Sequence, residues 1–251
     1  MSSILAIDAA TTGVTALVVT DRGTIAAKAT HALQQHVPEP GWVEHSPDEI
    51  WRATLGATRE CLAAWDGTLD QLDGIEIANE RATVLLWDRE TLGSPRRAIA
   101  REDLRTVDLC ERLRAAGHEQ RVTELTGLPL APGSSGTTLL WLAENEPNTW
   151  ALVEDGRYAI GTLDSYLIAR MTRGTWHVTD VANAGSTLLL DLEQGVWSAE
   201  LCDLFRVPMD ALPEILPEIL PGRRRLVTTE PRSFLDLELP IVGERSGDGA
   251  T

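Results

Sequence analysis

A carboxylate and two hydroxyl groups lie close together near the N-terminus, in the segment Asp8-Ala9-Ala10-Thr11-Thr12-Gly13. The apolar residues directly before it predict a buried strand, which places Asp8 at a strand end and the threonines in a tight turn. A carboxylate there can hold a hydrated divalent cation, and the backbone N–H groups of the turn can face a phosphate. A plain hairpin is the more common source of such a pattern, so the segment alone leaves both interpretations open.

The elements that must hold this turn follow from hydrophobic alternation and turn signals. Residues 4–30 predict a three-stranded antiparallel meander. Ser46-Pro47-Asp48-Glu49 supplies an N-cap, a proline at the first helical position and a capping-box glutamate, so a helix is expected over about 47–64. Further along we expect strands at 74–79 and 83–87, helices at about 103–115, 119–126, 135–146 and 162–171, an exposed loop over 212–221, a last strand over 234–242 and a glycine-rich turn over 243–251. Strands followed by helices and returning strands indicate α/β layers.

The charge balance excludes several classes of partner. The 251 residues include 38 acidic and 22 basic side chains, which gives a net charge of −16. So negative a surface repels phosphate backbones and anionic lipids, and we expect no nucleic-acid or membrane partner. No basic segment precedes an apolar run at the N-terminus, and no apolar run approaches the roughly 20 residues of a membrane span. A cytoplasmic location is therefore expected.

Cysteine and lysine usage narrows the chemistry further. Cys61, Cys110 and Cys202 lie far apart and form neither a metal-binding pair nor an even disulfide set, which indicates a reducing compartment. Lys28 is the only lysine of the chain, so neither a phosphate loop of the Walker type nor the strand lysine of protein kinases can be assembled.

Taken together, several segments resemble the FGGY carbohydrate kinases, and among them the glycerol kinases most closely. They occur in the family's order and near its spacing over essentially the whole chain, which is far more specific than any one of them. The matching residues are Asp8 with Thr11-Thr12; Pro40-Gly41-Trp42-Val43-Glu44-His45; Pro47-Asp48-Glu49-Ile50-Trp51; Asn79, Arg81 and Thr83; Trp87-Asp88-Arg89-Glu90-Thr91; Asp103 with Arg105-Thr106; Thr126-Gly127-Leu128; Ser135-Gly136-Thr137 with Trp141; Gly161-Thr162 with Asp164-Ser165; and Thr179-Asp180 with Asn183-Ala184.

The resemblance implies an α/β domain of the actin-like ATPase and ribonuclease-H-like type over residues 1–251, the substrate-side N-terminal half of a two-domain kinase. It implies ATP and Mg²⁺ as cofactors and a small polyol or sugar as substrate. Asp8 would hold Mg²⁺, directly or through water, and Thr11 and Thr12 would face the phosphate. Arg81 would orient the substrate, and Asp248 would contact it as the general base. The C-terminal nucleotide domain has no counterpart in this chain, so we expect the chain alone to be inactive and to associate with such a domain or with itself.

Departures from the family pattern favour a second interpretation. They are Ala10 in place of a glycine, Thr15 in place of an arginine, Ala82 in place of a glutamate, Arg101 in place of a tryptophan and Gly133 in place of a tyrosine. The first two weaken phosphate binding, and the other three remove polar or aromatic contacts to a polyol. A non-catalytic kinase-like domain that binds a small ligand or a protein partner is therefore the alternative.

Overall fold

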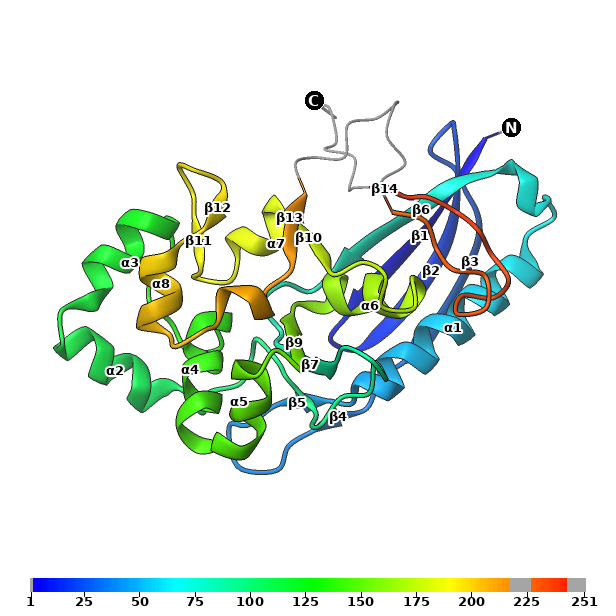
Figure 1. Ribbon diagram of the computed structural model, residues 1–251. Coiled ribbons are helices and arrows are strands. Elements are labelled where there is room, and N and C mark those ends of the chain that lie inside the picture. Colours follow the sequence, from blue (N-terminus) through cyan, green and yellow to red (C-terminus); the bar gives the residue numbers. More distant parts are fainter. Residues whose placement is uncertain (1, 217–226, 243–251) are drawn as a thin grey trace.

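A five-stranded sheet forms the centre of the first half of the chain in a computed structural model, which describes residues 2–216 and 227–242 (Figure 1). Its strand order is β14-β6-β1-β2-β3. The bounds are β1 Ser3–Ala10, β2 Gly13–Thr20, β3 Ile25–Ala32, β6 Leu72–Asn79 and β14 Ile241–Val242. Strands β1, β2 and β3 form the expected antiparallel meander, whereas β6 runs parallel to β1 and β14 runs parallel to β6. The carboxyl ends of β1 and β6 therefore meet at one edge of the sheet.

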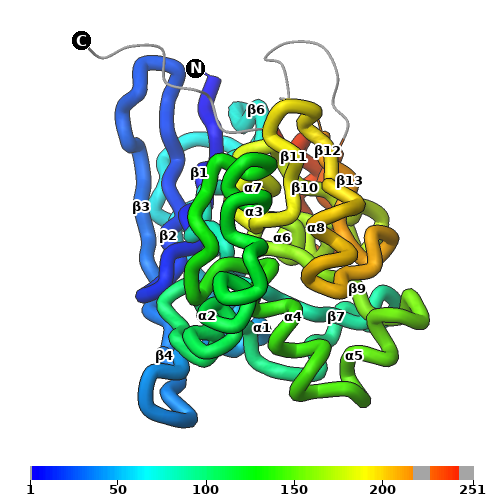
Figure 2. Tube along the Cα trace, turned by 90° about the vertical axis from the view of Figure 1, so that its left-hand side faces the viewer, coloured from blue at the N-terminus to red at the C-terminus, as the bar shows by residue number. Residues whose placement is uncertain are grey.

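One face of this sheet is apolar because the strands alternate. Leu5 and Ile7 of β1 are fully buried, whereas Asp8 on the opposite face is exposed. Helix α1 (Pro47–Ala64) packs on β2 and β3, and helix α6 (Leu163–Met171) contacts β6. Ser46 caps α1 by accepting a hydrogen bond from the N–H of Glu49 at 3.3 Å, as the sequence predicts. Figure 2 shows β1, β2 and β3 running side by side along one side of the molecule.

The remaining strands are β4 Gln35–His36, β5 Glu44–His45, β7 Leu85–Asp88, β8 Ala98–Ile99, β9 Tyr158–Gly161, β10 Val178–Asp180, β11 Leu190–Asp191, β12 Val196–Trp197 and β13 Glu214–Leu216. The remaining helices are α2 Val107–Ala115, α3 His118–Thr126, α4 Ser135–Asn145, α5 Pro147–Glu154, α7 Val181–Gly185 and α8 Ala199–Leu204, with short 3-10 turns at Leu69–Gln71 and Met209–Ala211. A second apolar core is built mainly from residues of α2, α3, α4, α5 and α8. These helices lie beside the sheet in Figure 1. Over the described residues no helix is long and apolar enough to cross a bilayer.

Three expected elements differ from the structure. The helix expected from 103 begins at Val107, because the Asp103 carboxylate accepts hydrogen bonds from the N–H groups of Val43 and Arg105 and holds residues 103–106 in a turn. The loop expected over 212–221 contains a strand instead, since Glu214–Leu216 pairs with β10; residues 217–221 lie outside the described part. The strand expected over 234–242 is confined to 241–242, because residues 234–239 turn around the Thr229 hydroxyl.

The close packing of the turn between β1 and β2 can be tested at Gly13. A Cβ at this position would lie 2.8 Å from the backbone oxygen of His31 in β3. Since the neighbouring backbone cannot move without breaking the sheet, we expect Gly13→Ala to lower the free energy of unfolding by about 1–3 kcal/mol in urea denaturation. In the control Gly185→Ala, the added Cβ meets only Leu190 Cδ2 at 3.7 Å, and stability should not fall. Equal stability of Gly13→Ala and the parent chain would contradict this packing.

Candidate active site

The turn after β1 presents its polar groups on the half-exposed face of the sheet. Asp8 is exposed, and the strand register sets it beside Thr15 of β2 and Ala78 of β6. The hydroxyls of Thr15 and Thr30 lie 2.9 Å apart on the neighbouring strands. No group of three or more histidine, cysteine or acidic side chains within residues 2–216 and 227–242 is arranged to hold a metal ion. A cation at Asp8 would therefore depend on water or on a phosphate for its other ligands.

A second turn lies directly against the first. The N–H of Glu80, at the end of β6, donates to the carbonyl of Ala9 at 2.9 Å. This bond extends the pairing of β1 and β6, so that the turn over residues 80–83 adjoins the turn carrying Thr11. Arg81 is exposed on this second turn. Asp8 near the end of β1 and Thr11 and Thr12 in the turn that follows it thus adjoin the turn that carries Arg81.

The loop after β8 completes the arrangement and explains one departure from the family pattern. Val84 and Ile99 exchange both backbone hydrogen bonds, at 3.0 and 3.1 Å, which brings the Arg81 turn and Arg101 to the same end of the pair. Gly133 has φ +74°, and a Cβ there would lie 1.8 Å from the Arg101 carbonyl oxygen. No side chain fits at position 133 in this backbone, so the aromatic residue of the family pattern is excluded by geometry as well as by sequence.

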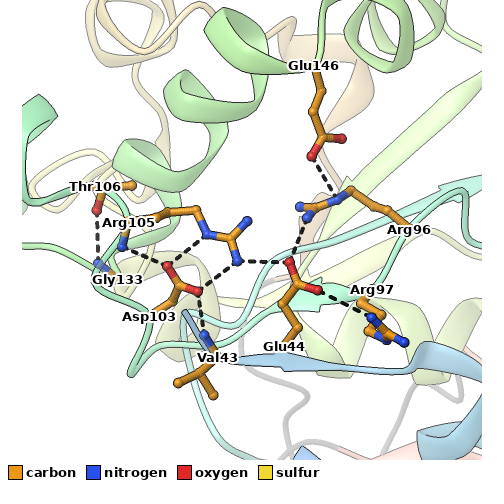
Figure 3. Close-up of polar contacts among 9 residues, drawn as sticks. All are labelled: Val43, Glu44, Arg96, Arg97, Asp103, Arg105, Thr106, Gly133 and Glu146. Atoms are coloured by element: carbon orange, nitrogen blue, oxygen red, sulfur yellow. Dashed lines mark hydrogen bonds and ion pairs between the residues drawn. The ribbon is translucent and has the colours of Figure 1, made fainter. Parts of the chain in front are cut away.

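A buried network of charges holds this loop (Figure 3). The Arg105 guanidinium donates from Nε and Nη2 to the two oxygens of Asp103, both at 2.8 Å, and from Nη2 to Glu44 Oε1 at 2.8 Å. The second oxygen of Asp103 also accepts the N–H of Val43 at 2.6 Å. The Arg105 and Asp103 side chains are each 1 % exposed, so these bonds are shielded from water. They join the 42–44 segment to the 101–106 loop.

Further groups balance Glu44 and enclose Arg105. Arg96 donates to Glu44 at 3.0 Å and pairs with Glu146 at 3.3 Å, so it bridges two carboxylates. The Arg105 guanidinium carbon lies 3.8 Å from the ring centroid of Trp42 and 4.9 Å from that of Trp141. Two indole rings and two carboxylates surround the Arg105 side chain and hold it in a single position. The backbone of the loop that carries Arg101 is held in place with it.

A second polar chain ties the end of β6 to the rest of the domain. Asn79 donates to Asn183 Oδ1 at 2.9 Å, and the N–H of Asn183 donates to Asp180, the N-cap of α7, at 2.6 Å. Behind it the fully buried Asp164 accepts hydrogen bonds from Thr162 at 2.5 Å and Thr179 at 2.6 Å. Burial raises the pKa of Asp164 to about 6, against the lowering effect of both hydroxyls.

One acid of the site was not singled out by sequence reasoning. Glu80 points inward from its turn, its Oε2 accepts a hydrogen bond from the Thr83 hydroxyl, and burial raises its pKa to about 7. The roles of Glu44 and Arg105 in the network were likewise missed, although both belong to the matching segments. Asp248, the predicted general base, lies outside the described residues.

The comparisons with known proteins agree with this architecture. The sequence profile described as the FGGY family of carbohydrate kinases, N-terminal domain, matches residues 3–243, and the chain belongs to this family. Its fold is the actin-like, ribonuclease-H-like α/β fold of these kinases.

Among individual relatives, the chain is 44% identical over 240 residues to a glycerol kinase of Methylobacterium nodulans, which covers 96% of this chain and 47% of the relative. It is 43% identical over 215 residues to a glycerol kinase of Rhodopseudomonas palustris, covering 86% of this chain and 43% of the relative. The crystal structure of Plasmodium falciparum glycerol kinase with ADP matches with a TM-score of 0.85 and 28% identity, covering 98% of this chain and 49% of that one. The chain thus spans about half the length of these relatives.

The buried network should make Arg105 indispensable for stability. A lysine keeps the charge but lacks the planar fork that reaches both oxygens of Asp103 and Glu44 together, so Arg105→Lys leaves at least one of these buried side-chain hydrogen bonds unmade. We expect a loss of about 1–3 kcal/mol in the free energy of unfolding. The matched control is Arg112→Lys, because Arg112 pairs with Glu144 at 2.7 Å with a side chain that is 59% exposed, and we expect a change within about 0.5 kcal/mol. If the two variants change the free energy of unfolding equally, the buried network stabilises the fold no more than an exposed ion pair does.

Asp164 should make stability depend on pH. Its pKa in the fold is about 6, above the ordinary value of 3.8, so the folded state binds a proton that the unfolded state has released. Stability from this group is full below pH 3.8, is lost as pH rises through about 6, and stays constant above that; the span is at most about 3 kcal/mol. Asp164→Asn should remove this loss, measured as the difference from the parent chain in urea midpoints across this range. Asp21→Asn, which changes an exposed acid, is the control and should lose stability with rising pH as the parent chain does. If Asp164→Asn also loses stability as the parent chain does, the loss does not come from Asp164.

Proposed function

We propose that this domain is the substrate-side half of a carbohydrate kinase that transfers the γ-phosphoryl group of ATP to a hydroxyl of a small polyol or sugar. The observation that carries the proposal is the hydrogen bond from Glu80 N–H to the Ala9 carbonyl, at 2.9 Å. It joins the turn suited to phosphate to the turn that carries Arg81. Phosphoryl transfer depends on holding the acceptor hydroxyl in line with the phosphate, which two adjoining turns on one sheet can do.

The residues present fit the cofactors of this reaction. Mg²⁺ prefers carboxylate and water oxygens and is commonly held by one or two carboxylates together with the phosphates of its nucleotide, and Asp8 offers one exposed carboxylate. MgATP, when bound, supplies the phosphoryl group. Thr11 and Thr12 would present their N–H and hydroxyl groups to it, and Arg81 would orient the acceptor. Asp248 would take the proton from the acceptor hydroxyl.

We also propose that residues 1–251 form one wall of a cleft. The chain spans 47% of one glycerol kinase relative, and its Asp8 turn lies on the half-exposed face of the sheet. An opposing domain would fix the nucleotide and exclude water, so the 251-residue chain should bind a substrate without turning over ATP. Such a domain, or a second copy of the chain, is the proposed partner. The net charge of −16 supports a protein without nucleic-acid or membrane partners, and the free cysteines Cys61, Cys110 and Cys202 support a reducing, cytoplasmic location.

A second candidate function is favoured by the geometry around Gly133. The Arg101 carbonyl fills the space of a side chain there, and Ala82 stands in the left-handed region at φ 76° with its carbonyl accepting a hydrogen bond from Ser135 at 3.0 Å. A polyol pocket that loses an aromatic wall and a carboxylate binds neutral hydroxyls weakly. The alternative is a non-catalytic domain that binds another small ligand or a protein.

A binding experiment separates the two candidates. Calorimetry of the purified chain with a panel of polyols and sugars should find at least one that binds saturably. Arg81→Ala should weaken this binding by about tenfold to a hundredfold, because charge-assisted hydrogen bonds to the acceptor are lost. Arg232→Ala, which removes an exposed arginine of the last turn, should leave the affinity unchanged. Failure of every compound to bind would favour the non-catalytic candidate.

An ADP-release assay with Mg²⁺ and the same panel tests turnover by the chain. We expect no substrate-dependent ADP. If ADP forms and disappears in Asp8→Ala, the one-wall proposal is wrong and this domain, or a dimer of it, is a complete kinase. In that case Asp248→Asn should lower turnover on the order of 10²–10⁴-fold if Asp248 is the base.

A further inference from the structure

A small cavity lies beneath the turn that carries Thr11. Its walls include Ala9, Ala10 and Thr11 from this turn, Glu80 and Thr83 from the adjoining turn, and His45 from β5. Its volume is about 10 Å³, close to the least that admits one water molecule. The cavity is therefore too small for an organic ligand and of the right size for a single water.

The walls of this cavity hold buried polar atoms without a partner. Glu80 Oε1 is shielded from solvent and makes no hydrogen bond within the described part of the chain. The ring nitrogens of His45 are shielded as well, and the backbone of Gln34 lies close enough to one of them to favour the protonated ring, which leaves the other ring nitrogen without a partner among the described residues. The other oxygen of Glu80 accepts the Thr83 hydroxyl. Buried polar groups of native proteins are nearly always paired, directly or through ordered water, because an unpaired group loses its hydrogen bonds to water without replacement. A water that bridges Glu80 Oε1 and one ring nitrogen of His45 would satisfy these two atoms.

The number of protons on this pair follows from charge burial. A carboxylic acid with a neutral imidazole, or a carboxylate with an imidazolium, is neutral overall and carries one titrating proton. Burial raises the pKa of Glu80 and lowers the pKa of His45, so near neutral pH the proton belongs on the carboxyl group. Its O–H can then donate to the water, which donates to a ring nitrogen of His45.

We propose that Glu80 and His45 share one proton through a single buried water, and that this unit positions the turn of Ala10 and Thr11 above it. Glu80 and His45 are positioning residues, because neither is placed against a substrate. The proposal concerns the folded chain itself and does not depend on whether the domain phosphorylates a polyol.

Charged groups of the neighbouring segments act on the protonation of both members of this unit. His36 of β4 and Glu49 of α1 face each other at 3.6 Å, and Glu49 favours the protonated form of His45 while His36 opposes it. From the loop after β8, Glu102 favours a proton on both members of the unit, and Arg101 favours the carboxylate form of Glu80. Loss of the shared proton at higher pH places a negative charge beneath the turn.

Nuclear magnetic resonance of the full chain tests the proposal directly. The Glu80 carboxyl carbon and the Thr11 amide should titrate with a common midpoint near pH 7, the value that the pKa of Glu80 predicts. A water molecule with a long residence time should give cross-relaxation peaks to the Thr11 amide. In Glu80→Gln, which keeps the shape but holds no titrating proton, the pH-dependent shift of the Thr11 amide should disappear. In the control Glu102→Gln the shift should remain, with a lower midpoint.

Two results would overturn the proposal. One is a Thr11 amide that shifts with pH equally in the parent chain and in Glu80→Gln. The other, which needs no variant to fold, is a parent chain in which the Glu80 carbon titrates in the ordinary range of glutamates or the Thr11 amide does not follow it.

Discussion

The parallel pairing of β1 with β6 is the constraint on which the rest of this site depends. Two strands that run the same way deliver their following turns to the same edge of a sheet. Here the pairing continues one residue beyond the end of β6, through the hydrogen bond from the N–H of Glu80 to the carbonyl of Ala9 at 2.9 Å. A turn rich in hydroxyls and a turn that carries an arginine thus lie side by side, although about 70 residues of chain separate them. Every role proposed for Asp8 or Arg81 rests on that adjacency.

Buried charge then fixes the third segment of the site. Asp103, Arg105 and Glu44 lie in the interior, where an unpaired charge is strongly unfavourable and a charge paired with an opposite charge is tolerated. Such a network adds little net stability compared with apolar residues of equal volume. Its contribution is to hold these side chains in one arrangement, because the Arg105 guanidinium must pair with two carboxylates while it lies between two indole rings. The buried side chains of the loop that carries Arg101 therefore hold this loop in place, and its exposed side chains can differ without moving it.

The departures from the family pattern have consequences beyond the side chains they change. Glycine at position 133 lets the Arg101 carbonyl approach until no Cβ fits between them. The backbone has thus closed over the place where the family pattern described above has an aromatic residue, and no side chain fits there unless the Arg101 carbonyl moves. Ala82 shows the same coupling, because its left-handed conformation is held by the Ser135 hydroxyl from the start of α4. The conformation of these loops is thus coupled to the residue types at positions 82 and 133.

Local sequence signals determined much of the fold. Alternation predicted the meander, Ser46 and Pro47 predicted the start of α1, and the order of the matching segments predicted the family. What the sequence could not determine was which charges are buried and which partners they meet. Glu44 and Arg105 are 61 positions apart, and Asn79 and Asn183 are 104 positions apart. The sequence also could not show that Glu80 points inward, or that a side chain at position 133 would collide with the Arg101 carbonyl. Strand alternation and helix capping depend on neighbours within about four residues, whereas burial and pairing of a charge depend on segments that meet only when the chain has folded.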